Sequence, residues 1–201
     1  MAAIKQDDLI ESVADAFQYI SYYHPKDYID ALALAYEREE SSAAKDAIAQ
    51  ILTNSKMSAQ GRRPMCQDTG LAVVFVKLGM EVKWSGATMT VDEMIHEGVR
   101  RAYTHPDNKL RASVVKDPAN RRVNSRDNTP AVIHYEVVAG SDIEITVAAK
   151  GGGSENKAKF TTLMPSDSLA DWIVDVVPAM GAGWCPPGML GIGVGGTAEK
   201  A

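Results

Sequence analysis

The pattern of this sequence changes from helical to extended at Leu71-Ala72-Val73-Val74-Phe75-Val76. This apolar run is short and rich in β-branched residues, as is typical of a buried strand. It therefore predicts the first buried strand of the chain.

Two amphipathic helical runs precede this strand. In the first, apolar residues recur at helical spacing after a cap at Asp7 or Asp8, and the helix is expected to end near His24-Pro25. The second run extends from Tyr28 to about Ile51, with Ser41-Ser42 as a point of interruption. The first third of the chain is therefore predicted to be helical.

Helices and strands alternate after residue 76. Thr90-Val91-Asp92-Glu93 has the pattern of a capping box and predicts a helix to about Tyr103. The β-rich runs 131–138 and 143–149 flank a turn and predict a strand pair, with a hairpin as one possibility. A last helix is expected from a cap within residues 166–168 to about Val177. This order indicates a mixed α/β fold with small sheets flanked by helices, and it leaves the topology open.

Composition narrows the class of protein. The 201 residues are 45% hydrophobic and 23% charged, as expected for a globular chain that can bury a core. A net charge of −5 gives no bias toward nucleic acid or anionic membranes. The N-terminus lacks the basic and apolar segments of a signal peptide, and no window has the length of a membrane span. We therefore expect a cytoplasmic protein with neither nucleic acid nor membrane as partner.

Two cysteines, Cys66 and Cys185, lie in short runs of polar, Gly and Pro residues. A structural cysteine usually packs in an apolar stripe, whereas a reactive or metal-binding thiolate needs a loop that brings polar groups around the sulfur. Their wide separation does not resemble a disulfide framework. Both are therefore candidate metal-binding or catalytic thiols, with inert thiols in turns as the alternative.

Three separated motifs together resemble the class I, iron–sulfur-dependent fumarate hydratases. They are Cys66-Gln67-Asp68-Thr69-Gly70, Lys150-Gly151-Gly152-Gly153-Ser154-Glu155-Asn156-Lys157, and Trp184-Cys185-Pro186-Pro187-Gly188 followed by Gly195-Gly196-Thr197-Ala198-Glu199-Lys200. They occur in family order and cover nearly the whole chain. The resemblance implies that residues 1–201 form the N-terminal, alpha-type domain of a longer iron–sulfur hydro-lyase, truncated at its C-terminal end.

This resemblance also implies roles for individual residues. Cys66 and Cys185 match two of three cysteine ligands of a 4Fe-4S cluster, so the third ligand is expected outside this chain. Asp68 corresponds to a catalytic acid and Gln67 to a hydrogen-bond donor for substrate. Arg111, in a Leu-Arg-Ala-Ser setting, matches the substrate-side arginine. The catalytic base is not visible and is expected in the missing region.

The residues themselves leave alternatives open. A loop aspartate such as Asp68 more often caps a turn, and a lone arginine is more often on the surface. The run that begins at Gly151 offers consecutive backbone N–H groups to a substrate carboxylate or to cluster sulfides, with a tight turn as the alternative. Residues 191–196 fit a dinucleotide-binding fingerprint literally, but the preceding prolines leave little room for the required strand.

The resemblance implies an enzyme of the tricarboxylic acid cycle that reversibly hydrates fumarate to (S)-malate, with a homodimer as its expected assembly. A tartrate dehydratase of the same family is the alternative. A third possibility is that the isolated chain is a catalytically silent binding or assembly domain, which the missing C-terminal region completes.

Overall fold

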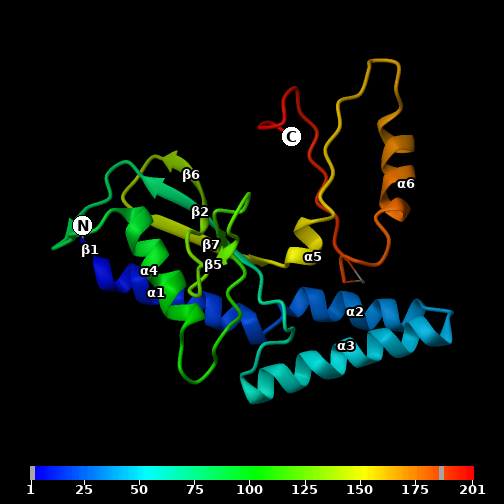
Figure 1. The fold of residues 1–201 in the computed structure, drawn as a ribbon, viewed down its shortest axis with the longest axis horizontal. Coiled ribbons are helices and arrows are strands. Elements are labelled where there is room, and N and C mark those ends of the chain that lie inside the picture. Colours follow the sequence, from blue (N-terminus) through cyan, green and yellow to red (C-terminus); the bar gives the residue numbers. More distant parts are fainter. Residues whose placement is uncertain (1–2, 186–187) are drawn as a thin grey trace. The chain divides into compact units, whose positions relative to one another are not determined.

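The computed structural model of the chain describes residues 3–185 and 188–201. It divides into two compact units, Met1–Lys150 and Gly151–Ala201, which are described separately below. Figure 1 shows the helices and strands of both units. The fold is mixed α/β with small sheets, as predicted.

The first unit is built around a three-stranded sheet with the predicted apolar strand at its centre. This strand, β2 (Leu71–Gly79), pairs in parallel with β6 (Val132–Val138) and antiparallel with β7 (Ile143–Lys150). The register places Phe75 opposite His134 on one side and Thr146 on the other. Alternate β2 residues, Ala72, Val74 and Val76, are at most 1% exposed.

Both of the last two predicted strands form, but their predicted pairing, with a hairpin as one possibility, is wrong. Strands β6 and β7 lie on opposite sides of β2 and do not pair with each other. The apolar β2 takes the centre, where both of its edges are hydrogen-bonded and one face is buried. The two flanking strands are mostly exposed or half-buried, as expected for strands at sheet edges.

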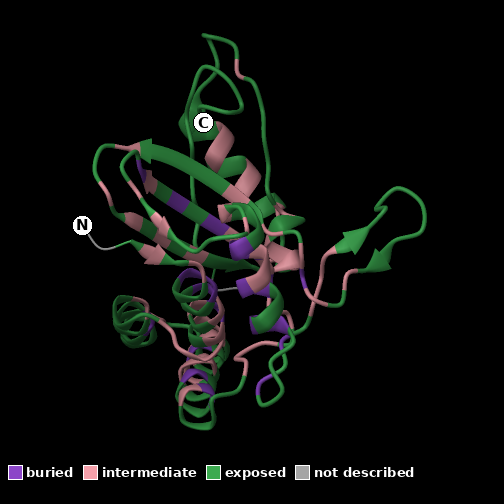
Figure 2. Ribbon diagram, turned by 90° about the vertical axis from the view of Figure 1, so that its left-hand side faces the viewer, coloured by how far each residue is buried: buried purple, intermediate pink, exposed green. Residues whose placement is uncertain are grey.

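Two helices cover the buried face of the sheet. They are α1 (Gln6–Tyr22) and α4 (Val91–Tyr103), and both contribute to the main apolar core together with β2. Gly98 allows close contact between them, because a Cβ atom there would lie 2.7 Å from the carbonyl oxygen of Ile10. Figure 2 shows the buried residues gathered on these helices and on the central strand.

The caps of these helices differ from prediction in one case. The capping box of α4 is confirmed, since Thr90 and Glu93 each accept from the other's backbone N–H. In contrast, α1 begins at Gln6 and has Lys5, not Asp7 or Asp8, at its N-cap. The two aspartates lie in the first turn instead. Their negative charges there interact favourably with the positive end of the helix dipole and stabilise the helix.

The second predicted helical run is divided at its serines. It forms α2 (Lys26–Arg38) and α3 (Ser42–Gly61), and Ser41 caps α3 by accepting from the backbone N–H of Ala44 at 3.4 Å. Figure 1 shows the two helices lying side by side as a hairpin. The C-terminal end of α3 leads directly to the segment that contains Cys66.

Short strands complete the first unit. β1 (Ile4–Lys5) pairs with β3 (Trp84–Ser85), and β4 (Val115–Lys116) pairs with β5 (Val123–Asn124). The β4–β5 hairpin lies between α4 and β6 in the chain. It projects from the rest of this unit and is exposed along its strands (Figure 2).

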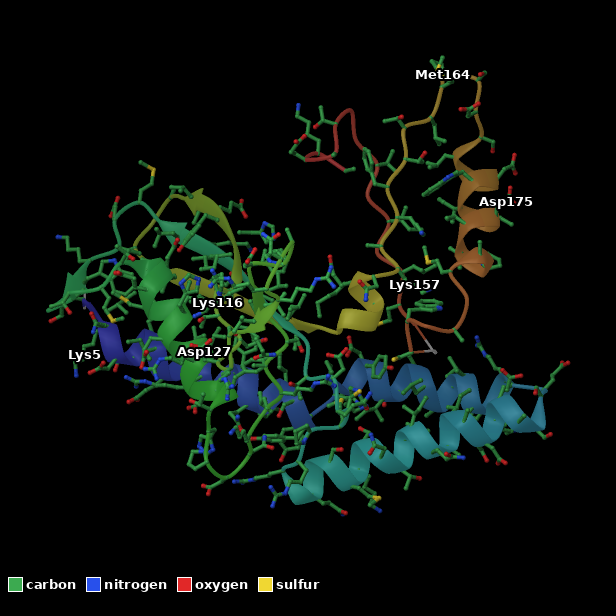
Figure 3. The ribbon with its side chains drawn as sticks, in the orientation of Figure 1. Lys5, Lys116, Asp127, Lys157, Met164 and Asp175 are labelled. Atoms are coloured by element: carbon green, nitrogen blue, oxygen red, sulfur yellow. The ribbon has the colours of Figure 1, made fainter. Side chains whose placement is uncertain are left out.

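The second unit contains α5 (Gly152–Glu155) and α6 (Leu169–Ala179). The predicted cap of α6 is confirmed, because Ser168 Oγ accepts from the backbone N–H of Asp171 at 3.2 Å. No residue described in this unit is buried, and α6 exposes apolar side chains such as Leu169 and Val174. Figure 3 shows Asp175 on α6 and Met164 in the loop that precedes it.

Candidate functional site

The first cysteine follows a residue that is fixed to two helices. The backbone N–H of Met65 donates to the carbonyl oxygen of Ser21, at the end of α1, over 3.0 Å. Its own carbonyl oxygen accepts from Asn54 Nδ2 of α3 over 2.7 Å. The start of the Cys66 turn is thereby held at the junction of α1 and α3.

The turn itself wraps polar groups around the sulfur of Cys66. The backbone N–H of Asp68 donates to Cys66 Sγ over 3.4 Å, and Asp68 Oδ1 accepts from the backbone N–H of Gly70 over 3.1 Å. The Cys66 thiol lies 3.5 Å from Gln67 Oε1. Cys66 and Asp68 are half-buried, whereas Gln67 is exposed. A loop that directs a backbone N–H at the sulfur is the kind of surrounding in which metal-binding thiols are found. Asp68 thus caps the turn, as the structural alternative predicted, and also lies beside the cysteine.

Arg111 is joined to this turn despite its distance in sequence. Thr69 Oγ1 accepts from the backbone N–H of Arg111 over 2.8 Å and donates to the Arg111 carbonyl over 2.9 Å. The Arg111 side chain is exposed. The structure thus brings Cys66, Asp68 and Arg111 into one region.

Three further arginines that could bind a carboxylate lie on or next to the projecting hairpin. Arg121 and Arg122 occupy its turn region, and Arg126 follows β5. All three are exposed, and nothing in their contacts links them to the Cys66 turn.

Two buried polar residues at this site were missed by sequence reasoning. Tyr103 OH donates to the carbonyl oxygens of Thr69 and Gly70, and Asn128 Nδ2 donates to that of Gly70. Both side chains are 0% exposed. Burial raises the pKa of Tyr103 well above its ordinary value, and the nearby charge of Asp68 raises it further. No motif marks these residues, because they act on backbone atoms of a distant segment.

The remaining predicted residues lie in the second unit, where two motifs meet. Ser154 Oγ donates to the carbonyl oxygen of Trp184 over 3.4 Å, and a Cβ atom on Gly153 would lie 2.8 Å from the Gly183 carbonyl oxygen. Gly151 is the N-cap of α5 and accepts from the backbone N–H of Glu155. The glycine run is therefore packed against the segment that leads to Cys185.

Cys185 itself is exposed, with a positive φ of 63°. Its backbone N–H donates to Ala182. The neighbouring Pro186 and Pro187 of the predicted motif lie outside the described residues. Cys66, Gln67, Asp68 and Arg111 thus belong to one unit, and Gly151 and Cys185 to the other. Among residues 3–185 and 188–201, no three His, Cys, Asp or Glu side chains converge as a metal site.

A cavity of about 640 Å³ lies elsewhere in the first unit, between α1 and the ends of α3 and α4. Its lining includes Arg62, Arg63, Arg101 and Asn108, and none of the predicted site residues. Helices of membrane-spanning length and hydropathy are absent from the part of the chain that the structure describes.

A family profile described as "Fumarate hydratase (Fumerase)" matches residues 10–201. The chain is 34% identical over 195 residues to a protein of Methanocaldococcus jannaschii named putative L(+)-tartrate dehydratase subunit alpha. It is 32% identical over 190 residues to fumarate hydratase 2 of Leishmania major, and 31% identical over 172 residues to the anaerobic class I fumarate hydratase of Escherichia coli.

These matches cover most of this chain but different shares of the relatives. They include 94% of this chain and 67% of the Methanocaldococcus protein. For the Leishmania and Escherichia fumarate hydratases they include 92% and 84% of this chain, but only 33% and 31% of the relatives. The chain therefore spans about two thirds of a tartrate dehydratase alpha subunit and about one third of a fumarate hydratase.

Proposed function

Because this chain belongs to the fumarate hydratase (Fumerase) family, we propose that it forms part of a hydro-lyase that reversibly hydrates fumarate to (S)-malate. One observation carries this proposal. A single turn places the Asp68 carboxylate two residues from Cys66 and directs the Asp68 backbone N–H at the Cys66 sulfur. Cys66, a candidate ligand, and Asp68, a candidate acid, therefore share one short segment.

The donor chemistry of the chain fits part of a 4Fe-4S site. Cys66 and Cys185 would supply two thiolate ligands, and a third would come from outside this chain. When bound, such a cluster supplies a Lewis-acidic iron that lacks a protein ligand. The N–H directed at Cys66 Sγ and the exposure of Cys185 are both compatible with thiolate ligation.

Side chains of the first unit would transfer the proton and bind the substrate. Asp68, next to Cys66, would protonate the hydroxyl that leaves when malate is dehydrated, and take a proton back in hydration. Arg111 would bind a substrate carboxylate, for which the guanidinium fork is well suited. Gln67, exposed beside Cys66, would donate a hydrogen bond to the substrate.

Gly151 is proposed to present backbone N–H groups of the second unit to a substrate carboxylate. The carbonyl of Gly151 already closes the first turn of α5, which fixes the orientation of this peptide segment. The resemblance further predicts a homodimer, which sedimentation of the complete enzyme would test.

Tartrate dehydration is a second candidate function. The alignment with the tartrate dehydratase alpha subunit covers 94% of this chain, so the substrate could be a dicarboxylate with one more hydroxyl than malate. Fumarate and L(+)-tartrate turnover should therefore be assayed in parallel on the complete enzyme. A ratio of kcat/KM that strongly favours tartrate would overturn the fumarate proposal while leaving the hydro-lyase class in place.

The cluster can be tested on the chain itself. We expect anaerobic incubation with iron and sulfide to load iron on the wild-type chain and much less on Cys66→Ser, with Ser58→Ala in α3 as a control that keeps both thiols. Absence of specific iron binding by the chain, together with a full cluster in the complete enzyme, would mean that the rest of the enzyme is needed to build the site. Absence in both would contradict the cluster assignment.

A further inference from the structure

We propose that Tyr103 and Asn128 are positioning residues, which hold the Cys66–Gly70 turn and the Arg111 segment in one fixed arrangement. The inference rests on the proposed function, because it assigns both residues to that site. Neither side chain has to contact substrate. They act by fixing the backbone that carries Cys66, Asp68 and Arg111.

Tyr103 anchors the turn from the last residue of α4. Its hydroxyl donates to the Thr69 carbonyl oxygen over 2.8 Å and to that of Gly70 over 3.1 Å. Its ring packs near Phe17 of α1, with 6.2 Å between ring centroids. Since the ring belongs to the helical core, the hydroxyl presents a fixed donor to the turn. Burial keeps the phenol protonated, so the donor is retained across the working pH range.

Asn128 connects the same turn to the segment after Arg111. Its Nδ2 donates to the Gly70 carbonyl oxygen over 3.0 Å, and its Oδ1 accepts from the backbone N–H groups of Ser113 and Val114 over 2.7 and 3.2 Å. Only an amide places a donor and an acceptor in this way on one short side chain. The residue also has a positive φ of 63°, a conformation that asparagine tolerates better than most residues.

The local surroundings support a fixed position for Asn128. Its backbone N–H donates to Ser125 Oγ over 3.0 Å. The preceding Asp127 lies beside the C-terminal part of α4 in Figure 3, near enough to Arg100 for their charges to interact. The backbone at Asn128 is therefore fixed by the Ser125 side chain.

Three segments meet through these bonds. The Gly70 carbonyl receives one bond from α4 and one from Asn128, while Thr69 Oγ1 joins the turn to Arg111 directly. The apolar core lies mainly in α1, α4 and β2 and includes the ring of Tyr103, which Tyr103→Phe retains. Loss of one bond should therefore displace the turn without unfolding the unit.

The two residues should affect different kinetic constants. The Tyr103 hydroxyl donates to carbonyl oxygens of the turn. Tyr103→Phe should therefore misplace Asp68 and lower kcat by about 10- to 100-fold, with KM changed by less than about threefold. Asn128→Gly keeps the backbone conformation but frees both segments. It should lower kcat and also raise KM about tenfold, because Arg111 loses its alignment.

Matched controls separate positioning from general loss of structure. Tyr135→Phe also removes a tyrosine hydroxyl that contacts an α4 residue, Asp92, but lies away from the turn. Asn120→Gly removes an exposed asparagine amide from the β4–β5 hairpin. Both controls should keep kcat and KM within about twofold of wild type in the complete enzyme.

A second readout does not require activity. Hydrogen exchange of the chain should be at least about tenfold faster at the amides of Asp68 and Gly70 in Tyr103→Phe, with Ser113 and Val114 unchanged. In Asn128→Gly, all four amides should exchange faster. The amides of α1 and β2 should keep wild-type rates in both variants.

The kinetic and exchange measurements test the positioning role separately from the proposed hydro-lyase function. Unchanged exchange at the turn, a uniform increase across the unit, or local loosening with wild-type kinetics would each overturn the positioning role. If the wild-type complete enzyme hydrates neither fumarate nor tartrate, the proposed function fails. The exchange pattern alone then decides whether Tyr103 and Asn128 position the turn.

Discussion

Gly70 shows how one residue permits the candidate site. It has φ of +79°, and a Cβ atom there would lie 2.6 Å from the carbonyl carbon of Ala149 and 2.9 Å from the backbone nitrogen of Lys150. Glycine alone allows the turn to approach the end of β7 this closely. The position therefore couples the Cys66 turn to the sheet.

We predict that Gly70→Ala lowers the free energy of unfolding by about 3 kcal/mol, because left-handed strain adds to backbone overlap. Gly86→Ala is the matched control, since Gly86 has φ of +65° but no atom within 4 Å of the added Cβ. It should cost only about 1 kcal/mol, from strain alone. Urea unfolding of both variants measures the difference, and equal losses would contradict the role of close packing at Gly70.

His24 gives a pH-dependent prediction at the same scale. Its Nδ1 lies 3.0 Å from Ser55 Oγ, and partial burial lowers its pKa below the ordinary value of 6.5. The folded state therefore favours neutral histidine. Its contribution to stability is fully present above about pH 6.5 and is lost as the pH falls through the lower pKa of the folded state.

We expect the wild-type chain to lose more stability than His24→Gln as the pH is lowered from 7.5 to about 5. The comparison removes contributions from other groups, which both proteins share. Urea midpoints at several pH values measure the effect. Parallel pH profiles for the two proteins would show that His24 titrates alike in the folded and unfolded states.

The residues that the sequence could identify are those that act within one short segment. Cys66 and Asp68 are two positions apart, so their joint placement follows from a tight turn. Arg111 lies 42 positions from Thr69, its backbone partner, and only the family resemblance marked it. Tyr103 and Asn128 could not be found, because a bond to a distant carbonyl leaves no local pattern.

Helix α4 illustrates stability at the scale of an element. Thr90 Oγ1 accepts from the backbone N–H of Glu93 over 3.3 Å, while Glu93 accepts from the Thr90 N–H over 2.7 Å. These bonds satisfy N–H groups that would otherwise lack a partner at the helix start. The hydrogen bonds from Thr90 lower the pKa of Glu93 below its ordinary value.

We predict that Thr90→Ala destabilises the first unit by about 1 kcal/mol. Ser168→Ala removes the equivalent cap from α6, in the other unit, and should leave unfolding of the first unit unchanged. Urea unfolding followed by circular dichroism measures the destabilisation by Thr90→Ala. No shift in midpoint for Thr90→Ala would contradict the contribution of the capping box.

Elements with local signals were the ones that the sequence placed correctly. The capping box of α4, the apolar run of β2 and the serine break between α2 and α3 each depend on neighbouring residues. Strand order does not, because it depends on which strand fills the centre of the sheet. The predicted pairing of the last two strands was wrong for this reason, since β2 separates β6 from β7.

At the scale of the whole molecule, the two units differ in what they bury. Helix α4 contains six buried residues, Met94, Ile95, Gly98, Val99, Ala102 and Tyr103. Helix α6 contains none, although its sequence is strongly apolar. Phe160, Met164, Val174 and Met189 of the second unit are each at least 65% exposed. Exposed apolar surface of this kind is typical of a region that packs against another polypeptide segment.

Hydrogen exchange should reveal this difference directly. We predict that amides of α6 in the chain alone exchange at least about 100-fold faster than those of α4, because local opening of α6 exposes little additional apolar surface. In the complete enzyme, α6 should become protected while α4 changes little. Equal protection of both helices in the chain alone would show that the second unit is stable by itself. Rapid exchange of α6 in both forms would mean that its apolar side chains remain uncovered in the complete enzyme.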